Sequence, residues 1–121
     1  MKQKDVLTSR KLLQHRREAH NKALWQEVER LTAAASELGV QRIVLFGSLM
    51  VGKPRLTSDL DLLIVWDTPL GFIERTVELY CRLQPRVATD LLVYTPREME
   101  RMIHTSLVRR ALEKGKVLYE A

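Results

Sequence analysis

The first third of the chain carries the apolar spacing of an amphipathic helix. Residues 8–38 are predicted to be helical, and from Leu24 to Leu38 apolar side chains recur every three or four positions and so lie on one side of a helix. The portion before Asn21 is less regular and far more basic. The pattern leaves open whether this portion is a separate helix or a projecting arm. Gly39 follows as a residue suited to ending a helix. The members of the apolar stripe are Leu24, Val28, Leu31, Ala35 and Leu38.

Apolar runs further along the chain predict strands. Residues 40–46 contain an unbroken run of Ile, Val, Leu and Phe, which is typical of a strand buried on both faces. Residues 59–66 and 87–94 are similarly rich in Leu, Ile and Val, so each predicts a strand. A shorter apolar run at 117–119 is a candidate edge strand.

Helices are predicted between and after these strands. One spans 68–83 and opens with Thr68-Pro69, because proline is tolerated in the first turn of a helix. Another begins with the capping box Thr95-Pro96-Arg97-Glu98 and reaches about His104, and the last runs to Lys114. This order of elements predicts an α/β (α+β) domain, with a small mixed sheet flanked by helices.

The chain has the length of one domain, 121 residues, within which we distinguish two parts. Residues 1–38 form a basic helical segment that is expected to pack on the domain. Residues 39–121 form the core that holds the candidate chemistry.

Charge and composition narrow the function classes. Lys and Arg number 20 against 15 Asp and Glu, and eight of the basic residues lie within residues 1–30. Such a surface attracts polyanions, among them nucleoside triphosphates, nucleic acids and acidic proteins. A single cysteine, Cys81, excludes an internal disulfide and favours a cytoplasmic location. No apolar run approaches the roughly 20 residues that cross a bilayer, so no membrane association is expected.

Three aspartates stand out because they interrupt apolar strands. Asp59 and Asp61 lie two apart, so their carboxylates face the same side of a strand. Asp90 lies in the third predicted strand and reaches this pair if the two strands are neighbours. Grouped carboxylates repel one another, and Mg²⁺ relieves that repulsion because it prefers oxygen ligands. Three such acids can hold two Mg²⁺ ions for phosphoryl transfer. The alternative for Asp90 is a structural ion pair with Arg86.

The turn after the first strand supplies the second half of a candidate site. Gly47 allows a phosphate to approach the backbone closely, and the Ser48 hydroxyl adds a hydrogen-bond donor. A Gly-Ser pair alone is usually only a turn. Its position ten residues before Ser58-Asp59-x-Asp61 makes the combination much more specific.

Gly47-Ser48 followed by Asp59-Leu60-Asp61 resembles the signature of the DNA polymerase beta-like nucleotidyltransferase superfamily. The similarity is greatest to its smallest members, the minimal nucleotidyltransferases, and extends from about Val40 to the end of the chain. The resemblance implies that Asp59, Asp61 and Asp90 bind two Mg²⁺ ions and serve catalysis. It also implies that the Gly47-Ser48 turn, with Ser58, binds the nucleotide.

The chain departs from that family pattern between the two motifs. Relatives often carry arginines where this sequence has Leu49 and Val51. Lys53 and Arg55 are the basic residues that could supply the missing positive charge to a triphosphate.

The resulting hypothesis is a Mg²⁺-dependent nucleotidyltransferase that transfers AMP from ATP to an acceptor hydroxyl. By resemblance, the expected acceptor is a HEPN-domain toxin, for which this chain would be the antitoxin. About 27 residues follow Tyr94, so an acceptor-binding domain is expected on another chain. A second hypothesis is a non-catalytic module that neutralises its partner by masking it. A third, nucleic-acid binding through the basic first helix, is less favoured, and homo-oligomerisation is left open.

Overall fold

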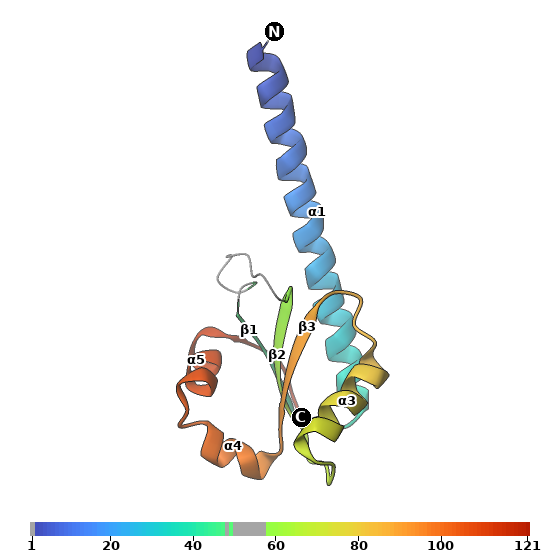
Figure 1. Cartoon of the computed structure of the whole chain (residues 1–121), viewed down its shortest axis with the longest axis vertical. Coiled ribbons are helices and arrows are strands. Elements are labelled where there is room, and N and C mark those ends of the chain that lie inside the picture. The colour runs from blue at the N-terminus through green and yellow to red at the C-terminus, as the bar shows by residue number, and fades with distance from the viewer. Residues whose placement is uncertain (1, 48, 50–57) are drawn as a thin grey trace.

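A four-stranded mixed sheet forms the centre of the molecule (Figure 1). The structure is a computed structural model that describes residues 2–47, 49 and 58–121, with side chains described from Thr8 onward. The strands lie side by side in the order β3-β2-β1-β4. Their bounds are β1 Arg42–Phe46, β2 Leu60–Val65, β3 Thr89–Tyr94 and β4 Lys116–Glu120.

The strand directions make the sheet mixed, as predicted. β1 runs antiparallel to both β2 and β4, whereas β2 and β3 run parallel. A parallel pair needs a long crossover, and α3 (Phe72–Leu83) supplies it between β2 and β3. The candidate edge strand at 117–119 is confirmed as part of β4, which pairs with β1 at the edge of the sheet as described.

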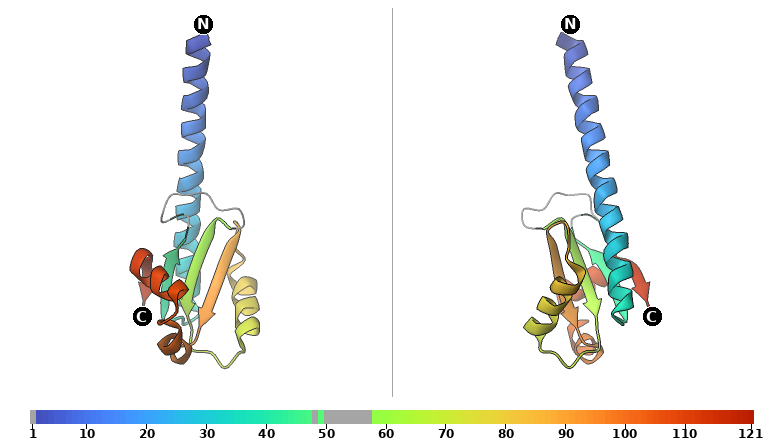
Figure 2. Two further views of the ribbon diagram at one scale, coloured as in Figure 1. Left: turned by 60° about the vertical axis from the view of Figure 1, so that its left-hand side comes forward. Right: turned by 90° about the vertical axis from the view of Figure 1, so that its right-hand side faces the viewer.

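Helices cover both faces of the sheet (Figures 1 and 2). α1 (Lys2–Glu37) and α3 lie on one face, and α4 (Pro96–Met102) and α5 (Ser106–Lys114) lie on the other. Side chains of β2 alternate between these two layers, because successive residues of a strand point to opposite faces. Leu60, Leu62 and Ile64 belong to the core under α1 and α3, whereas Leu63 and Val65 belong to the core under α4 and α5.

The predicted first helix is a single continuous helix. Its apolar stripe is confirmed where it meets the sheet, since Leu24, Val28, Leu31 and Ala35 are all at most 5% exposed. Gly39 adopts φ +84, a left-handed conformation that favours glycine and ends the helix. Residues 8–23 are all exposed, and Figure 1 shows this part of α1 projecting beyond the body. We call residues 8–23 the arm.

One predicted boundary is wrong by four residues. The helix expected from Thr68 begins at Phe72, with Gly71 at its N-cap in an extended conformation. The hydroxyl of Thr68 accepts a hydrogen bond from the Leu70 backbone N–H at 3.3 Å, so this segment forms a local turn. By contrast, the capping box at the start of α4 is confirmed, because Thr95 and Glu98 cap each other reciprocally.

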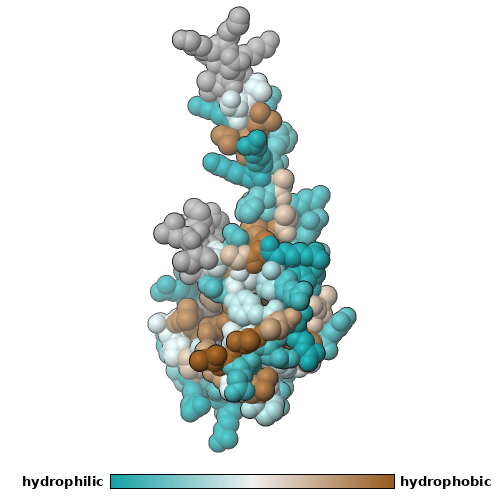
Figure 3. Space-filling model, turned by 45° about the vertical axis from the view of Figure 1, so that its right-hand side comes forward, coloured by the Kyte–Doolittle hydropathy of each residue, from teal (hydrophilic) through white to brown (hydrophobic). Residues whose placement is uncertain are grey.

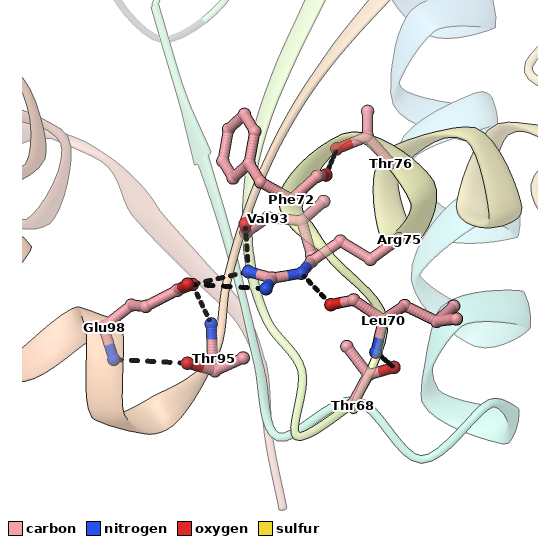
Figure 4. A network of polar contacts seen from close by, with 8 residues as sticks. All are labelled: Thr68, Leu70, Phe72, Arg75, Thr76, Val93, Thr95 and Glu98. Atoms are coloured by element: carbon pink, nitrogen blue, oxygen red, sulfur yellow. Dashed lines mark hydrogen bonds and ion pairs between the residues drawn. The ribbon is translucent and has the colours of Figure 1, made fainter.

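A buried arginine joins α3, β3 and α4 at the end of β3 (Figure 4). The Arg75 side chain is 6% exposed, and its Nη1 contacts the Glu98 carboxylate at 2.5 Å. It also donates to the carbonyl oxygens of Leu70 at 3.1 Å and Val93 at 3.4 Å. This arginine is therefore a structural connection between the two helical layers.

Among the helices that the structure describes, none combines the length and the apolar character needed to cross a membrane.

Candidate functional site

Asp61 and Asp90 lie directly opposite each other on neighbouring parallel strands. The β2–β3 register pairs Asp61 with Asp90, and the β1–β2 register pairs Asp61 with Phe46. Paired residues of adjacent strands point to the same face and are separated by about 4.8 Å between strands. The two carboxylates therefore share one face of the sheet, which is the face that carries α4 and α5.

This face of the sheet is more exposed at the end where the two aspartates lie. Along β3, the residues on this face change from exposed Asp90 through half-buried Leu92 to Tyr94, which is 8% exposed. The helices α4 and α5 pack against the opposite end, where Tyr94 and Val65 belong to the apolar core. A ligand can therefore approach Asp90 from solvent. Among the described residues, none forms an ion pair with Asp90, so the predicted alternative of a pair with Arg86 is wrong.

Asp59 lies next to this pair but outside the strand. The strand was predicted from residue 59, whereas β2 begins at Leu60 and Asp59 lies in a bend. The backbone N–H groups of Asp59 and Leu60 both donate to the carbonyl of Ala88, at 2.8 and 3.1 Å. Within residues 2–47, 49 and 58–121, no three His, Cys, Asp or Glu side chains are close enough to form a ready metal site.

Ser58 is positioned by contact with Asp61. Its side chain is 4% exposed, and its Oγ donates a hydrogen bond to Asp61 Oδ1 at 3.0 Å. Asp61 itself is 2% exposed. A buried carboxylate needs hydrogen-bond donors to offset its lost hydration, so Ser58 both stabilises and orients Asp61.

The glycine of the predicted phosphate-binding turn has the expected special conformation. Gly47 follows β1, one residue beyond the Phe46–Asp61 pair, and adopts φ +82. A left-handed φ at this point favours glycine and turns the chain away from the strand next to Asp61. Ser48, Lys53 and Arg55 lie outside the described residues.

Tyr80 contacts the backbone beside Asp90, although no sequence pattern indicated this contact. Its hydroxyl accepts a hydrogen bond from the Leu91 backbone N–H at 3.2 Å and donates one to the Thr89 carbonyl. These two groups flank Asp90 on the outer edge of β3, which lies at one end of the described strand order. Burial, with a further contribution from the charge of Asp90, raises the pKa of Tyr80, so the hydroxyl stays protonated. No sequence pattern indicates this role, because the position of Tyr80 in its helix shows nothing unusual.

The acidic side chains suit a hard divalent cation. Asp61 and Asp90 present carboxylate oxygens from two adjacent strands, and Asp59 follows within one residue of β2. Mg²⁺ is bound in proteins through one or two carboxylates together with phosphate oxygens of the substrate. The donor set therefore fits Mg²⁺ in the presence of a nucleotide, although the described residues form no complete cage by themselves.

A family model with the description "Polymerase beta, Nucleotidyltransferase" matches residues 29–121. This span begins inside α1 and includes the whole sheet, Gly47 and all three aspartates.

Two individual proteins are also similar to the chain. A protein of Methanocaldococcus jannaschii named "Putative protein adenylyltransferase" is 32% identical over 82 residues, which are 66% of this chain and 79% of that protein. A crystal structure described as a "putative nucleotidyltransferase" from Sulfolobus solfataricus is also similar. The alignment covers 81% of this chain and 86% of the chain in that structure. That alignment has 18% identity and a TM-score of 0.49.

Proposed function

The chain belongs to the polymerase beta nucleotidyltransferase family, and from this premise we propose that it transfers AMP from ATP to a hydroxyl group of a partner protein. The name of the Methanocaldococcus jannaschii relative, a protein adenylyltransferase, supports the choice of AMP and of a protein acceptor. The observation that carries the proposal is the pairing of Asp61 with Asp90 at the open end of the sheet, beside the Gly47 turn.

The proposed roles of the aspartates follow from their surroundings. Asp59, Asp61 and Asp90 would hold two Mg²⁺ ions, which neutralise charge on the triphosphate when bound. Asp61 is the better fixed of the three, because it is buried and its Oδ1 accepts from Ser58. Asp90 is the solvent-exposed member, so its carboxylate is the one that an acceptor hydroxyl can reach.

The reaction exchanges one P–O bond for another. The acceptor oxygen forms a bond to the α-phosphorus of ATP, and the bond from that phosphorus to the bridging oxygen breaks. Pyrophosphate leaves with the bonding electron pair, and the Asp90 carboxylate accepts the hydroxyl proton. The backbone at Gly47, with Ser48, Ser58, Lys53 and Arg55, is proposed to hold the phosphates that leave. Positioning and charge neutralisation account for most of the catalysis, because the protein forms no covalent intermediate.

The proposed acceptor is a HEPN-domain toxin, and the chain would then be its antitoxin. This part of the proposal follows from the resemblance to the minimal nucleotidyltransferases. Modification of the toxin by AMP would be the means of neutralising it. Nucleic acid is not a proposed partner.

The test uses the full chain, ATP labelled at the α-phosphate, Mg²⁺ and the HEPN-domain protein encoded nearest to its gene. We expect label on the acceptor with the wild-type chain. The variants Asp61→Asn and Asp90→Asn should lose about 100-fold or more of the rate, because each removes one negative charge from the site. Asp67→Asn is the matched control, since Asp67 is an exposed aspartate just beyond β2 and far from the pair in the register.

The competing hypothesis, a non-catalytic masking module, makes different predictions for the same materials. Such a module would neutralise the acceptor without ATP, and calorimetry would detect no binding of ATP with Mg²⁺. The enzymatic proposal would be rejected if the wild-type chain and Asp61→Asn label the acceptor equally. It would also be rejected if the wild-type chain neutralises the acceptor fully without labelling it.

A further inference from the structure

The arm is the part of α1 that projects beyond the body of the molecule (Figure 1). All of its described side chains, residues 8–23, are exposed, although they belong to the same helix that packs on the sheet further along. A helix without tertiary contacts is only marginally stable in water. The exposed surface of the arm is therefore a candidate binding surface for another molecule.

One side of the arm lies in line with the buried stripe of α1. Counting back from Leu24 at the same spacings of four and three reaches His20, Arg17, Leu13 and Arg10. Residues at these spacings lie along one side of a helix. This line of four residues, which we call the arginine face, therefore points to the same side of the helix as the core does.

The arginine face combines two arginines and a histidine with one apolar residue, and the exposed residues Leu12 and Arg16 lie to one side of it. Leu13 lies between Arg10 and Arg17 along the helix, and it is 53% exposed. Lys11 and Lys22, which are also exposed, fall on the opposite side of the helix by the same spacing. Figure 3 shows the arm as a mostly hydrophilic projection with isolated apolar side chains.

The arm also stands at the catalytic end of the sheet. It leaves the body beyond the end where β2 and β3 begin, which is the end that carries Asp61 and Asp90 (Figures 1 and 2). A partner bound along the arginine face would thus lie beyond the same end of the sheet as the two aspartates.

We propose that the arginine face docks an acidic amphipathic helix of the acceptor protein. The inference rests on the proposed function only in identifying this partner as the acceptor. Guanidinium groups pair with carboxylates through two parallel hydrogen bonds, and Leu13 between them requires an apolar residue on the partner. An acidic helix with leucines along one side offers both.

Two other occupants fit the arm less well. The arm carries five Lys or Arg residues and a single Glu, so two copies of the chain would repel each other along it. Nucleic acid would neutralise the charge through its phosphates. It would leave Leu13 without an apolar counterpart.

The first test measures binding of a probe to the full chain by fluorescence anisotropy at physiological salt. The probe is a synthetic peptide of about 18 residues, or five helical turns, with Leu at every third or fourth position and Glu beside them. We expect binding that weakens about tenfold in Arg10→Ala/Arg17→Ala, since two charge pairs are lost. Leu13→Ala should also weaken it. Lys11→Ala/Lys22→Ala is the matched control, because it removes the same charge from the other side.

Several results would overturn the docking proposal. The proposal is rejected if the wild-type chain does not bind the peptide. It is also rejected if the arginine and lysine variants lose the same affinity for the peptide, because net charge alone would then explain the binding. Tighter binding of a single-stranded RNA of similar length, or of a peptide with Gln in place of Glu, would identify a different kind of partner. Self-association of the chain that Leu13→Ala abolishes would identify a second copy as the occupant.

A second measurement separates this inference from the proposed enzyme activity. In the labelling assay, Arg10→Ala/Arg17→Ala should raise KM for the acceptor about tenfold and leave KM for ATP unchanged. Asp61→Asn should abolish transfer and still bind the peptide. If the wild-type chain transfers nothing but binds the peptide as expected, the enzymatic proposal fails and the docking face stands. If the arginine variant transfers AMP with an unchanged KM for the acceptor, the docking proposal is rejected and the enzymatic proposal stands.

Discussion

Asp61 is the single charged residue in a strand whose other members are all apolar. Burial of a carboxylate is costly unless donors replace the water that it loses. Ser58 provides one such donor from three residues earlier in the chain, at 3.0 Å. A charge placed at this cost in stability is typical of a functional site, where the ligand later offsets the cost.

At the same scale, Tyr80 is expected to fix the backbone on either side of Asp90. Tyr80→Phe removes the hydroxyl that bonds to Leu91 and Thr89, so unfolding should become easier by about 1–2 kcal/mol. The rate of transfer should fall with KM for ATP little changed, because Asp90 becomes less well positioned. Thermal unfolding and steady-state kinetics provide the two measurements.

The control for Tyr80 is Tyr119→Phe. Tyr119 is a half-buried tyrosine on the other edge strand, and its hydroxyl has no hydrogen-bond partner within the described residues. This variant should match the wild type in both measurements. If Tyr80→Phe also matches the wild type, the tyrosine does not position Asp90.

The sequence predicted single residues well where one rule decides their position. Alternation along strands placed Asp61 on one face, and the strand order then brought Asp90 opposite to it, as the register shows. The contact of Tyr80 was not predictable, because it joins a helix to the edge of a strand that follows after a turn. Nothing in the spacing indicates which edge of β3 faces outward.

At the scale of elements, one ion pair connects α4 to α3. The hydrogen bond from Arg75 is the main cause of a lowered pKa of Glu98 in the folded protein, and the Thr95 backbone N–H adds to it. A lowered carboxyl pKa means that the folded state favours the charged form. The resulting stabilisation is complete above the ordinary range for glutamate and is lost as the pH falls through the lowered pKa.

Glu98→Gln tests this dependence, since glutamine keeps the capping box but carries no charge. At neutral pH the variant should be less stable than the wild type by about 2 kcal/mol, because Arg75 loses its charged partner. The difference should shrink as the pH is lowered below about 4. Melting temperatures between neutral and acidic pH measure it. Glu100→Gln, an exposed neighbour on the same helix, should show no such convergence.

The junction between α5 and β4 depends on the absence of a side chain at Gly115. A Cβ atom there would lie 2.3 Å from the Ala111 carbonyl oxygen and 2.7 Å from that of Leu45. Both contacts are with backbone, which cannot rotate away. Gly115→Ala should therefore destabilise the protein by about 1–3 kcal/mol in denaturant unfolding.

Gly71→Ala is the comparison, since a Cβ atom at Gly71 meets nothing within 4 Å. Its cost should be at most about 1 kcal/mol, from the weaker N-cap alone. Equal effects of the two substitutions would show that backbone freedom, rather than the close approach at Gly115, decides the result.

The sequence predicted whether each element is a helix or a strand. It predicted the start of a helix correctly only where the capping signal was complete. The reciprocal bonds of Thr95 and Glu98 fix the start of α4, and this start was predicted correctly. Thr68-Pro69 offered a similar but incomplete signal, and the chain instead makes a short turn before Gly71. Proline is compatible with both outcomes, so this dipeptide alone does not fix where the helix begins.

For the whole molecule, the sequence predicted a mixed sheet with flanking helices but left the course of the first segment open. The apolar stripe ends at Leu24, and no pattern upstream says whether the helix continues. The structure shows that α1 does continue, and residues 8–23 of it are exposed. Continuity of this kind depends on local helix propensity, which is a weaker guide than burial.

This division of α1 predicts two very different rates of amide hydrogen exchange within one helix. Residues 24–37 pack on the sheet and should exchange only through global or near-global opening. In the arm, side-chain support within the described residues is limited to local contacts such as Gln14 with Glu18 at 3.3 Å, so opening should cost only about 0–1 kcal/mol. Exchange measured by mass spectrometry on overlapping peptides resolves the boundary near Leu24.

The same measurement responds to occupancy of the arm. A ligand that binds only the helical form stabilises it in proportion to its concentration and affinity. The acidic peptide should therefore slow exchange in residues 8–23 and leave residues 24–37 unchanged. Arg10→Ala/Arg17→Ala should reduce this protection, whereas Lys11→Ala/Lys22→Ala should preserve it. Strong protection of the arm in the isolated chain would contradict the prediction, because it would mean that something already covers the arm.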